Sequence, residues 1–398
     1  MSEGLSGWQK YKFSDVLIDE SISYGIVQPG AHSEIDSVPV VRVNNIKNGQ
    51  IIIADVLKVT KEIEEKYQRT RLEGGELLIT VVGSIGECAI VPDSLKGWNV
   101  ARAISVARIK NNFDKRFIKY CFKLEDLKFQ MYGKTNDTVQ PTLNLSLLKE
   151  LVLLIPSLPE QQAIAAVLSS LDDKIDLLHR QNKTLESMAE TLFRQWFIEE
   201  VQEDWKVGEL NDLIDVLSGF PFKSTSFNES GNFQLITIKA VQDGYLDLSN
   251  ADRLNEIPSN MPDYCDLRNG DILLSLTGNV GRCCLVDSDH LLLNQRVAKI
   301  QPKQNRDWAF AYVFFRQLSM KRTLEELAKG TAQANLSPVE TSKIAFVIPV
   351  ESALQKYNDI ATPLIKKTLR NKIQIKRIEK LRDTLLPKLM SGEVRVAV

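Results

Sequence analysis

A heptad repeat of leucines is the feature that most constrains how this chain can fold. Within residues 159–197, leucine recurs at every seventh position, and a second row of every-seventh residues runs beside it. This is the a/d pattern of a coiled coil, whose apolar seam needs another helix to cover it. The seam residues expected on this helix are Leu171, Leu178, Asn182, Leu185 and Leu192.

A second stretch of helical period, residues 352–390, is the expected partner. Each stretch follows a hydrophobic run that ends in Ile-Pro, at Ile155-Pro156 and at Ile348-Pro349. If the helices run antiparallel and paired residue numbers sum to 553, apolar positions meet apolar positions and Asn182 faces Asn371. The seam residues expected on the second helix are Asn371, Ile375, Ile378 and Leu385.

The charges of the two stretches agree with this pairing. Residues 160–200 carry eight acidic and four basic side chains, whereas residues 366–388 carry nine basic and two acidic ones. Opposite charges at the flanks of a seam favour pairing. We therefore expect an intramolecular antiparallel coiled coil.

Length and composition limit the class of protein. A chain of 398 residues fits two to three domains. There is no secretory signal pattern and no 18-residue apolar stretch, so we expect a cytoplasmic protein with no membrane association. The five cysteines have no C-x-x-C spacing, which argues against a disulfide framework and a zinc site. Because the formal net charge is −1, any DNA site must be a local patch.

The chain is a tandem duplication. The segment Gly-Glu-Leu-Leu-Ile-Thr-Val-Val-Gly-Ser-Ile-Gly-Glu-Cys at 75–88 aligns residue for residue with 270–283, an offset of 195. Each copy predicts strands around a Gly-x-x-Gly turn, and an amphipathic helix follows at 115–132 or 308–328. A polar loop and a last strand then lead into the long helix.

These elements predict an α/β (α+β) protein of two similar globular domains with a pseudo-twofold relation. The expected divisions are a first domain at 1–155, a central helix at 156–200, a second domain at 201–349, and a C-terminal helix and tail at 350–398.

Signatures of catalysis are absent from the sequence. It has no G-x-G-x-x-G, P-loop, H-E-x-x-H or G-x-S-x-G motif, and its three histidines are well separated. Pro92-Asp93 with Asp126-Leu127-Lys128 has some likeness to a nuclease pattern, but such short pieces arise by chance. We expect no catalytic residue, no metal site and no cofactor bound by this chain.

Polar loops are the segments suited to binding. In each copy the Gly-x-x-Gly turn, a second loop near residue 100 or 295 and the loop after the amphipathic helix carry small, amide and basic residues. Amides read adenine edges, Arg and Lys read guanine or phosphate, and glycine allows close backbone approach. The alternative is that these are ordinary solvent-exposed turns with no binding role. The candidate DNA contacts are Arg102, Lys134, Thr135, Thr138, Gln140, Thr277, Asn279, Arg282, Gln295, Arg296, Thr331 and Gln333.

Several helical motifs carry a family resemblance. They are Leu-Pro-Glu-Gln-Gln at 158–162, Leu-Asp-Asp-Lys-Ile-Asp at 171–176, Thr-Leu-Phe-Arg-Gln-Trp-Phe at 191–197 and Leu-Pro-Lys-Leu-Met-Ser-Gly-Glu-Val-Arg-Val at 386–396. At these residues, and in its whole architecture, the chain resembles the specificity subunit of Type I restriction-modification systems. The second copy departs from the first at its glycine turn, with Thr277 and Arg282 in place of Val82 and Glu87.

The resemblance implies a function that spacing cannot show. Such a subunit has no catalysis of its own and reads both halves of an interrupted site in double-stranded DNA. It holds two adenine-methylating modification subunits that use S-adenosylmethionine, and it recruits ATP-driven restriction subunits. Two other hypotheses remain: an enzyme that modifies or cuts DNA alone, and a coiled-coil adaptor with no DNA role. The bases read and the spacer length do not follow from the sequence.

Overall fold

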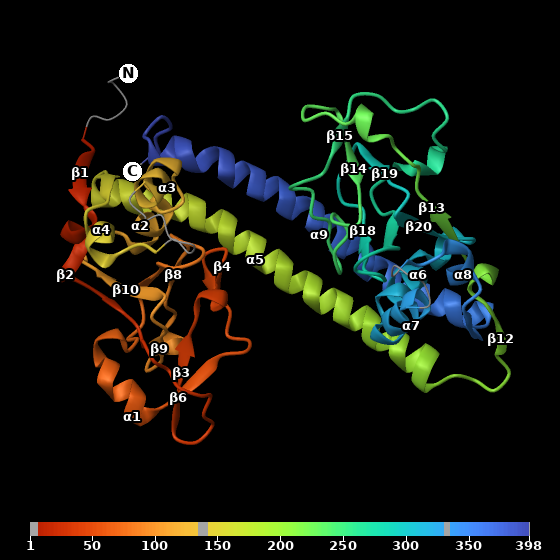
Figure 1. Cartoon of the computed structure of the whole chain (residues 1–398), viewed down its shortest axis with the longest axis horizontal. Helices are drawn as coiled ribbons and strands as arrows, with labels where there is room; N and C mark the ends of the chain where they lie inside the picture. The colour runs from red at the N-terminus through yellow and green to blue at the C-terminus, as the bar shows by residue number, and fades with distance from the viewer. Residues whose placement is uncertain (1–6, 134–141, 330–334, 398) are drawn as a thin grey trace. The chain divides into compact units, whose positions relative to one another are not determined.

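The computed structural model describes residues 7–133, 142–329 and 335–397 and shows two compact units (Figure 1). Unit 1 comprises Met1–Lys174 with Ile378–Val398, and unit 2 comprises Ile175–Arg377. Both boundaries fall inside the two long helices, so each unit contains a length of both. In the chain, α5 spans Leu158–Arg194 and α9 spans Glu351–Met390.

Unit 1 is built on a four-stranded antiparallel sheet of order β2-β10-β7-β8. A smaller sheet, β6-β3-β9, has a parallel β3–β9 pair, and β4–β5 and β1–β11 are two-stranded. The strands are β1 (Gln9–Lys12), β2 (Leu17–Tyr24), β3 (Ser37–Val41), β4 (Ile46–Lys47), β5 (Gln50–Ile51), β6 (Leu57–Thr60), β7 (Leu77–Thr80), β8 (Cys88–Ile90), β9 (Asn99–Val100), β10 (Ile104–Ile109) and β11 (Val152–Ile155). The helices are α1 (Lys61–Glu64), α2 (Lys115–Cys121), α3 (Glu125–Tyr132) and α4 (Leu145–Lys149).

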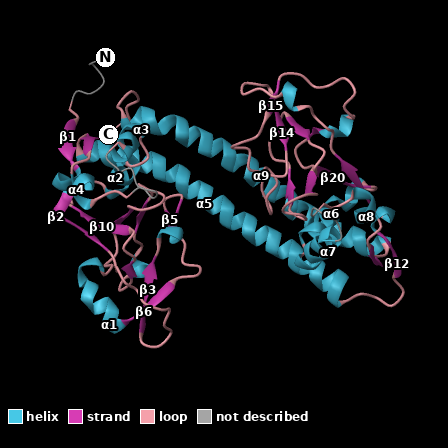
Figure 2. Ribbon diagram, viewed as in Figure 1, coloured by secondary structure: helices cyan, strands magenta, loops and turns pink. Residues whose placement is uncertain are grey.

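Unit 2 repeats this topology. Its main sheet has the order β13-β20-β17-β18, its second sheet β15-β14-β19-β16 again holds one parallel pair, and β12 pairs with β21. The strands are β12 (Lys206–Glu209), β13 (Ile214–Ser218), β14 (Phe233–Ile236), β15 (Arg253–Leu254), β16 (Asp266–Leu267), β17 (Ile272–Ser275), β18 (Cys283–Leu285), β19 (Leu291–Leu293), β20 (Val297–Pro302) and β21 (Ala345–Ile348). The helices are α6 (Trp308–Arg316), α7 (Leu318–Lys329) and α8 (Pro338–Ser342). The α+β class with two tandem domains, expected from the duplication, is confirmed (Figure 2).

The central strand of each main sheet is buried on both faces. Leu77 and Ile79 of β7 pack into the cluster that includes α2, whereas Leu78 packs on the opposite side with residues of the second sheet. In β17, Ile272 and Leu274 likewise face the helical side, and Leu273 faces the other. Alternate side chains of a strand point to opposite faces, which explains why these strands are apolar without interruption.

The prediction of a single amphipathic helix in each copy is wrong, because the structure has two shorter helices in its place. The break between α2 and α3 falls at residues 122–124, and Gln317 has an extended backbone between α6 and α7. All seven residues from Ala309 to Phe315 are buried, so α6 is covered all round rather than amphipathic. The polar face expected of one long helix is present on α7, where only Met320, Leu324 and Ala328 are buried.

Within unit 2, the long helices pair in antiparallel fashion. Asn371 Nδ2 donates to Asn182 Oδ1 at 2.8 Å, Lys372 Nζ lies 2.8 Å from Glu186 Oε1, and Tyr357 OH donates to the carbonyl of Ala189 at 3.1 Å. From the asparagine pair to the Tyr357 contact, the residue number on α5 rises from 182 to 189 while that on α9 falls from 371 to 357, and the two asparagines face each other as the seam predicts. Leu178 and Ile375 are buried in the same seam.

Burial varies along the predicted seam. Leu171, Leu185, Leu192, Ile378 and Leu385 are only half-buried, whereas Ala189 and Phe193 are buried at 0% and 3% exposure. The leucine row therefore lies at the flank of the helix near residue 190. The aromatic ring of Phe193, in contact with Phe310 and Tyr357, takes the central position there.

Candidate nucleic-acid interface

Three loops meet at one end of the main sheet in each unit. The first is the glycine turn between β7 and β8 or between β17 and β18. The hydroxyl of the last strand residue holds this turn: the Glu87 amide donates to Thr80 Oγ1 and the Arg282 amide to Ser275 Oγ, both at 3.0 Å. Thr80 and Ser275 occupy equivalent positions and are fully buried. The turn is thus fixed from beneath while its tip stays accessible.

The second loop precedes β10 or β20 and lies against the first. The amide of Val81 donates to the carbonyl of Ala103 at 2.9 Å, and the amide of Leu276 donates to the carbonyl of Arg296 at 3.0 Å. The amides of Arg102 and Gln295 bond the carbonyls of Ile26 and Phe220. Both copies thus make the same contacts, at offsets of 193 to 195 residues.

The third loop returns to the same place. The amide of Leu143 donates to the carbonyl of Val81 at 2.9 Å, and that of Leu336 to Leu276 at 2.7 Å. Bridges between Val82 and Thr142, and between Thr277 and Asn335, extend the contact. The ends of the predicted binding loops therefore converge. Six of the candidate contacts lie outside the described residues: Lys134, Thr135, Thr138, Gln140, Thr331 and Gln333.

A close backbone approach fixes the second loop in each unit. A Cβ atom at Gly25 would lie 2.0 Å from the carbonyl oxygen of Val100, and one at Gly219 would lie 2.3 Å from that of Asn294. Only glycine permits such an approach without moving the backbone. Gly25 and Gly219 occupy equivalent places, directly after β2 and directly after β13.

The described candidate side chains differ in availability. Arg102, Gln295 and Arg296 are exposed, and their side chains have no bonded partner among the residues that the structure describes. Thr277 and Arg282 are engaged within the protein. Thr277 Oγ1 donates to Asn335 Oδ1 at 2.7 Å.

The Arg282 guanidinium ties two segments together. It donates to Gln242 Oε1, and with the amide of Asn279 oriented so that its oxygen faces Arg282, it donates to Asn279 at 2.9 Å. Sequence reasoning missed Gln242, because no motif relates it to a residue 40 positions away. It also missed Thr80 and Ser275, although a hydroxyl residue at the same place in both copies was a signal that could have identified them.

Charged groups of the helix pair also carry perturbed pKa values. In unit 1, Asp172 of α5 accepts from Tyr120 OH at 2.7 Å and from Arg382 Nη1 at 2.8 Å. Burial alone would raise the pKa of Asp172, but Lys123, Arg382 and Tyr120 outweigh it and lower that pKa below its ordinary value. In unit 2, burial raises the pKa of Glu190, and Arg316 offsets this only in part.

In the described part of the chain, the side chains that commonly ligate metals form no candidate metal cluster, and the thiols are unpaired. Among residues 7–133, 142–329 and 335–397, no group of three or more His, Cys, Asp and Glu side chains could hold a metal ion. All five cysteines are buried and unpaired, and burial raises the pKa of their thiols, most strongly for Cys88 and Cys284. No described helix has the length and apolar character needed to cross a membrane.

Comparisons with known proteins place this duplicated architecture in a family. The chain matches the Type I restriction modification DNA specificity domain twice, over residues 6–187 and 202–380. It is 29% identical over 344 residues to the Type I restriction enzyme MjaIX specificity subunit of Methanocaldococcus jannaschii, covering 81% of this chain and 78% of that protein. It is 22% identical to the HindI specificity subunit of Haemophilus influenzae, covering 98% of this chain and all of that one.

A solved structure agrees at the level of the fold. The S subunit of the Type I restriction-modification system from M. genitalium superimposes with a TM-score of 0.63 at 17% identity, over 96% of each chain. The chain belongs to the Type I restriction modification DNA specificity family. Its function is accordingly that of the sequence-specificity component of such a system.

Proposed function

We propose that this chain is a non-catalytic, DNA-reading scaffold in which the three-loop face of each unit reads one half of an interrupted duplex site. The observation that supports this most directly is the convergence of the three loops at one end of the main sheet, twice over with the same hydrogen bonds. Base edges are read by exposed amide and guanidinium groups, and Arg102, Gln295 and Arg296 provide them.

The partners follow from the same proposal. The chain holds two adenine-methylating modification subunits, which use S-adenosylmethionine, and recruits restriction subunits, which use ATP. The chain itself binds neither cofactor and works in the cytoplasm. A chain of net charge −1 must contact DNA through local groups, which fits loops that expose arginine beside neutral amides.

Changes confined to one unit provide the test. Gln295→Ala and Arg296→Ala are expected to relax base preference in one half-site only, and Arg102→Ala in the other, each by about 1–3 kcal/mol at its own position. Gln140 and Gln333 were chosen from the sequence. Gln333→Ala is expected to relax base preference in one half-site only, and Gln140→Ala only in the other. Methyladenine mapping by single-molecule sequencing of DNA modified by the assembled complex measures the pattern. A change in both half-sites from one substitution would contradict the assignment.

Two assays separate the alternatives. Methylation or cleavage by the purified chain alone would support an enzyme acting by itself. No binding of random duplex at low salt would support an adaptor without a DNA role. Binding whose affinity falls steeply with salt would support the DNA-reading scaffold, because phosphate contacts give that dependence.

A further inference from the structure

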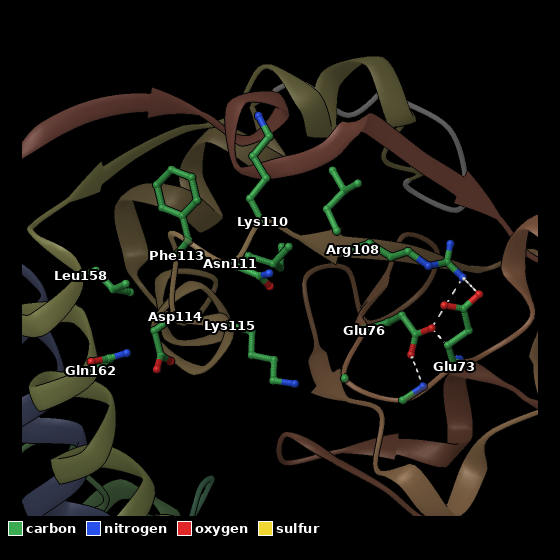
Figure 3. Close-up of a pocket in the computed structure, with 14 residues that line it drawn as sticks. Glu73, Glu76, Arg108, Lys110, Asn111, Phe113, Asp114, Lys115, Leu158 and Gln162 are labelled. Carbon is green, nitrogen blue, oxygen red and sulfur yellow. Dashed lines mark hydrogen bonds and ion pairs between the residues drawn. The ribbon is translucent and has the colours of Figure 1, made fainter.

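We propose that each unit carries, at an equivalent position, a pocket that receives an acidic side chain from one copy of the modification subunit; this rests on the proposed function. In unit 1 the cavity has a volume of about 390 Å³ and lies where the turn before β7, the end of β10, the start of α2 and the first turns of α5 meet (Figure 3). In unit 2 a cavity of about 810 Å³ lies between the turn before β17, the end of β20, the start of α6, and α9.

The two cavities are copies of each other. Gly75 and Gly270 lie in the turn of each, at φ of +86° and +95°. An acidic residue follows each glycine, Glu76 in one unit and Asp271 in the other. The long helices contribute Gln162 and Gln355, which differ by the same 193 positions that relate the helix entries. A pocket retained at the same place in both halves of a diverged duplication points to a shared ligand.

In unit 1 the cavity presents an unpaired cation. A Cβ atom at Gly75 would lie 2.5 Å from Lys115 Nζ, so the ammonium group sits directly over the turn. Figure 3 shows the Lys115 side chain extending between Gln162 and the cluster of Glu76 and Arg108. Lys115 and Gln162 are both exposed, and neither side chain has a bonded partner among the described residues.

Each acidic residue of this cavity already has a cationic partner within the protein. Glu76 is 3% exposed, accepts from the amides of Glu73 and Gly74 at 2.6 and 2.9 Å, and lies 3.6 Å from Arg108 Nη2. Glu73 lies 3.9 Å from the same guanidinium group. Asp114 pairs with Arg116 at 3.0 Å. The groups of the cavity without a bonded partner among the described residues are thus the ammonium of Lys115 and the amides of Asn111 and Gln162, which suit a carboxylate.

The cavity of unit 2 has the same electrostatic character with different residues. Asp271 lies 2.9 Å from Lys299 Nζ and accepts from the Arg268 amide at 2.8 Å, so its charge is satisfied. Trp308 takes the place of Lys115 and fixes the wall by donating its indole N–H to the carbonyl of Gly270 at 2.7 Å. The side chains of Arg268 and Lys366 are exposed without a bonded partner in the described part of the chain, and they outnumber the exposed carboxylate of Asp359.

The position of the cavities favours a protein ligand over DNA. Each lies before β7 or β17, whereas the glycine turn of the DNA-reading face follows the same strand. A strand of four residues spans about 13 Å at 3.3 Å per residue, so the cavity and the reading face lie at opposite ends of the sheet. A duplex bound at one end leaves the other for a partner, and two equivalent pockets match two copies of one partner.

Charge reversal in the full-length chain tests the proposal. The variants are Lys115→Glu, Arg268→Glu with Lys366→Glu, and all three together; the controls are Lys96→Glu and Lys206→Glu, which are exposed lysines of the same two units outside the cavities. Each variant is mixed with the modification subunit, and native mass spectrometry counts the bound copies. We expect two copies on the parent chain and on both controls, one on each pocket variant, and none on the triple variant. The affinity for the lost copy should fall about tenfold or more.

Binding of duplex DNA by the same chains, measured against salt concentration, completes the test. The pocket variants are expected to keep the parent's sequence specificity and its slope of log affinity against log salt concentration. Two copies retained by the triple variant would overturn the pocket assignment alone. A reduced salt slope with two copies retained would assign the cavities to nucleic acid and overturn it as well. A parent chain that takes up no modification subunit would overturn the proposed function, and the assignment with it.

Discussion

The two units attach equivalent helices to the long helices with different chemistry. In unit 1, α2 reaches Asp172 through the hydroxyl of Tyr120, and Arg382 bonds the same carboxylate. In unit 2, the ring of Phe310 on α6 lies 5.3 Å from that of Phe193 and 5.1 Å from that of Phe197. The backbone anchor is nevertheless alike, since a side-chain amide oxygen of a long helix accepts from an amide at the start of α2 or α6. Duplication has retained the backbone path while the packing chemistry diverged.

The largest expected difference between the units concerns aromatic packing. Phe310→Ala should cost about 3–5 kcal/mol of stability, because the ring is buried and contacts four other aromatic rings. Phe117→Ala is the matched change in unit 1, where the equivalent ring is also buried but has a ring contact with Trp8 at 6.2 Å. It should cost about 1 kcal/mol less. Chemical denaturation of the full chain measures both, and equal losses would contradict the contrast.

The charged contact of unit 1 should be the next most sensitive. Asp172→Asn should cost about 2–3 kcal/mol at neutral pH, because it removes the charged acceptor of Tyr120 and Arg382. The lowered pKa of Asp172 means that its stabilisation is present above the unfolded value of about 4 and is lost as pH falls through the folded value.

Denaturation as a function of pH is the measurement. The variant should lose part of the acid sensitivity of the parent chain below about pH 4. Asp173→Asn, at the exposed neighbouring position, serves as the control and should change little. An acid profile identical in parent and Asp172→Asn chains would be inconsistent with the role given to this carboxylate.

Replacing the asparagines of the unit 2 pair should lower stability by a smaller amount. Asn182→Leu should cost about 1–2 kcal/mol, because Asn371 Nδ2 then loses its bond within a buried seam. Asn371→Leu should cost less, since Asn371 Oδ1 is buried without a partner among the described residues and its removal is favourable. The double substitution should recover most of the loss. A double-mutant cycle measures this, and additive losses would show that the two amides do not interact.

The smallest effect is expected at Glu190. Its pKa is raised by burial, so at pH 7 its ionised form disfavours folding, and Glu190→Gln should stabilise unit 2 by roughly 0.5 kcal/mol or less given the partial exposure of the side chain. The gain should vanish below about pH 4, where the parent carboxyl is protonated. Glu186→Gln, which removes the partner of Lys372, should destabilise instead. Thermal unfolding at two pH values distinguishes them, and the same sign for both would be unexpected.

Periodic features were predictable from the sequence, and contacts without a period were not. Leucine spacing and the constant-sum rule place Asn182 opposite Asn371, and the structure has that bond. The break at Gln317 could not be predicted, because residues 309–315 continue a helical pattern and the turn depends on how α6 is covered by both long helices and the sheet. The partner of Arg282 lies 40 residues away on another loop, where no spacing rule applies.

The candidate site was predictable as a set of loops rather than as side chains. Repetition of the Gly-x-x-Gly turn marked equivalent loops in both copies, and these do converge. Exposure of Arg102 and engagement of Arg282 depend on neighbours that only three-dimensional structure supplies. The paired cavities carry no motif, because their residues come from four separate segments in unit 1 and three in unit 2.

The close approach at Gly25 and Gly219 has a consequence for how such a chain can acquire new specificity. Any side chain there would collide with the backbone of the loop that carries Arg102 or Gln295. In a saturation-mutagenesis library selected for folded protein, these two positions should tolerate no replacement, while the exposed loop residues beside them should accept nearly all. The glycine fixes the backbone path of the loop, so the exposed side chains of the loop can be exchanged freely. The bases read can therefore change without refolding the unit.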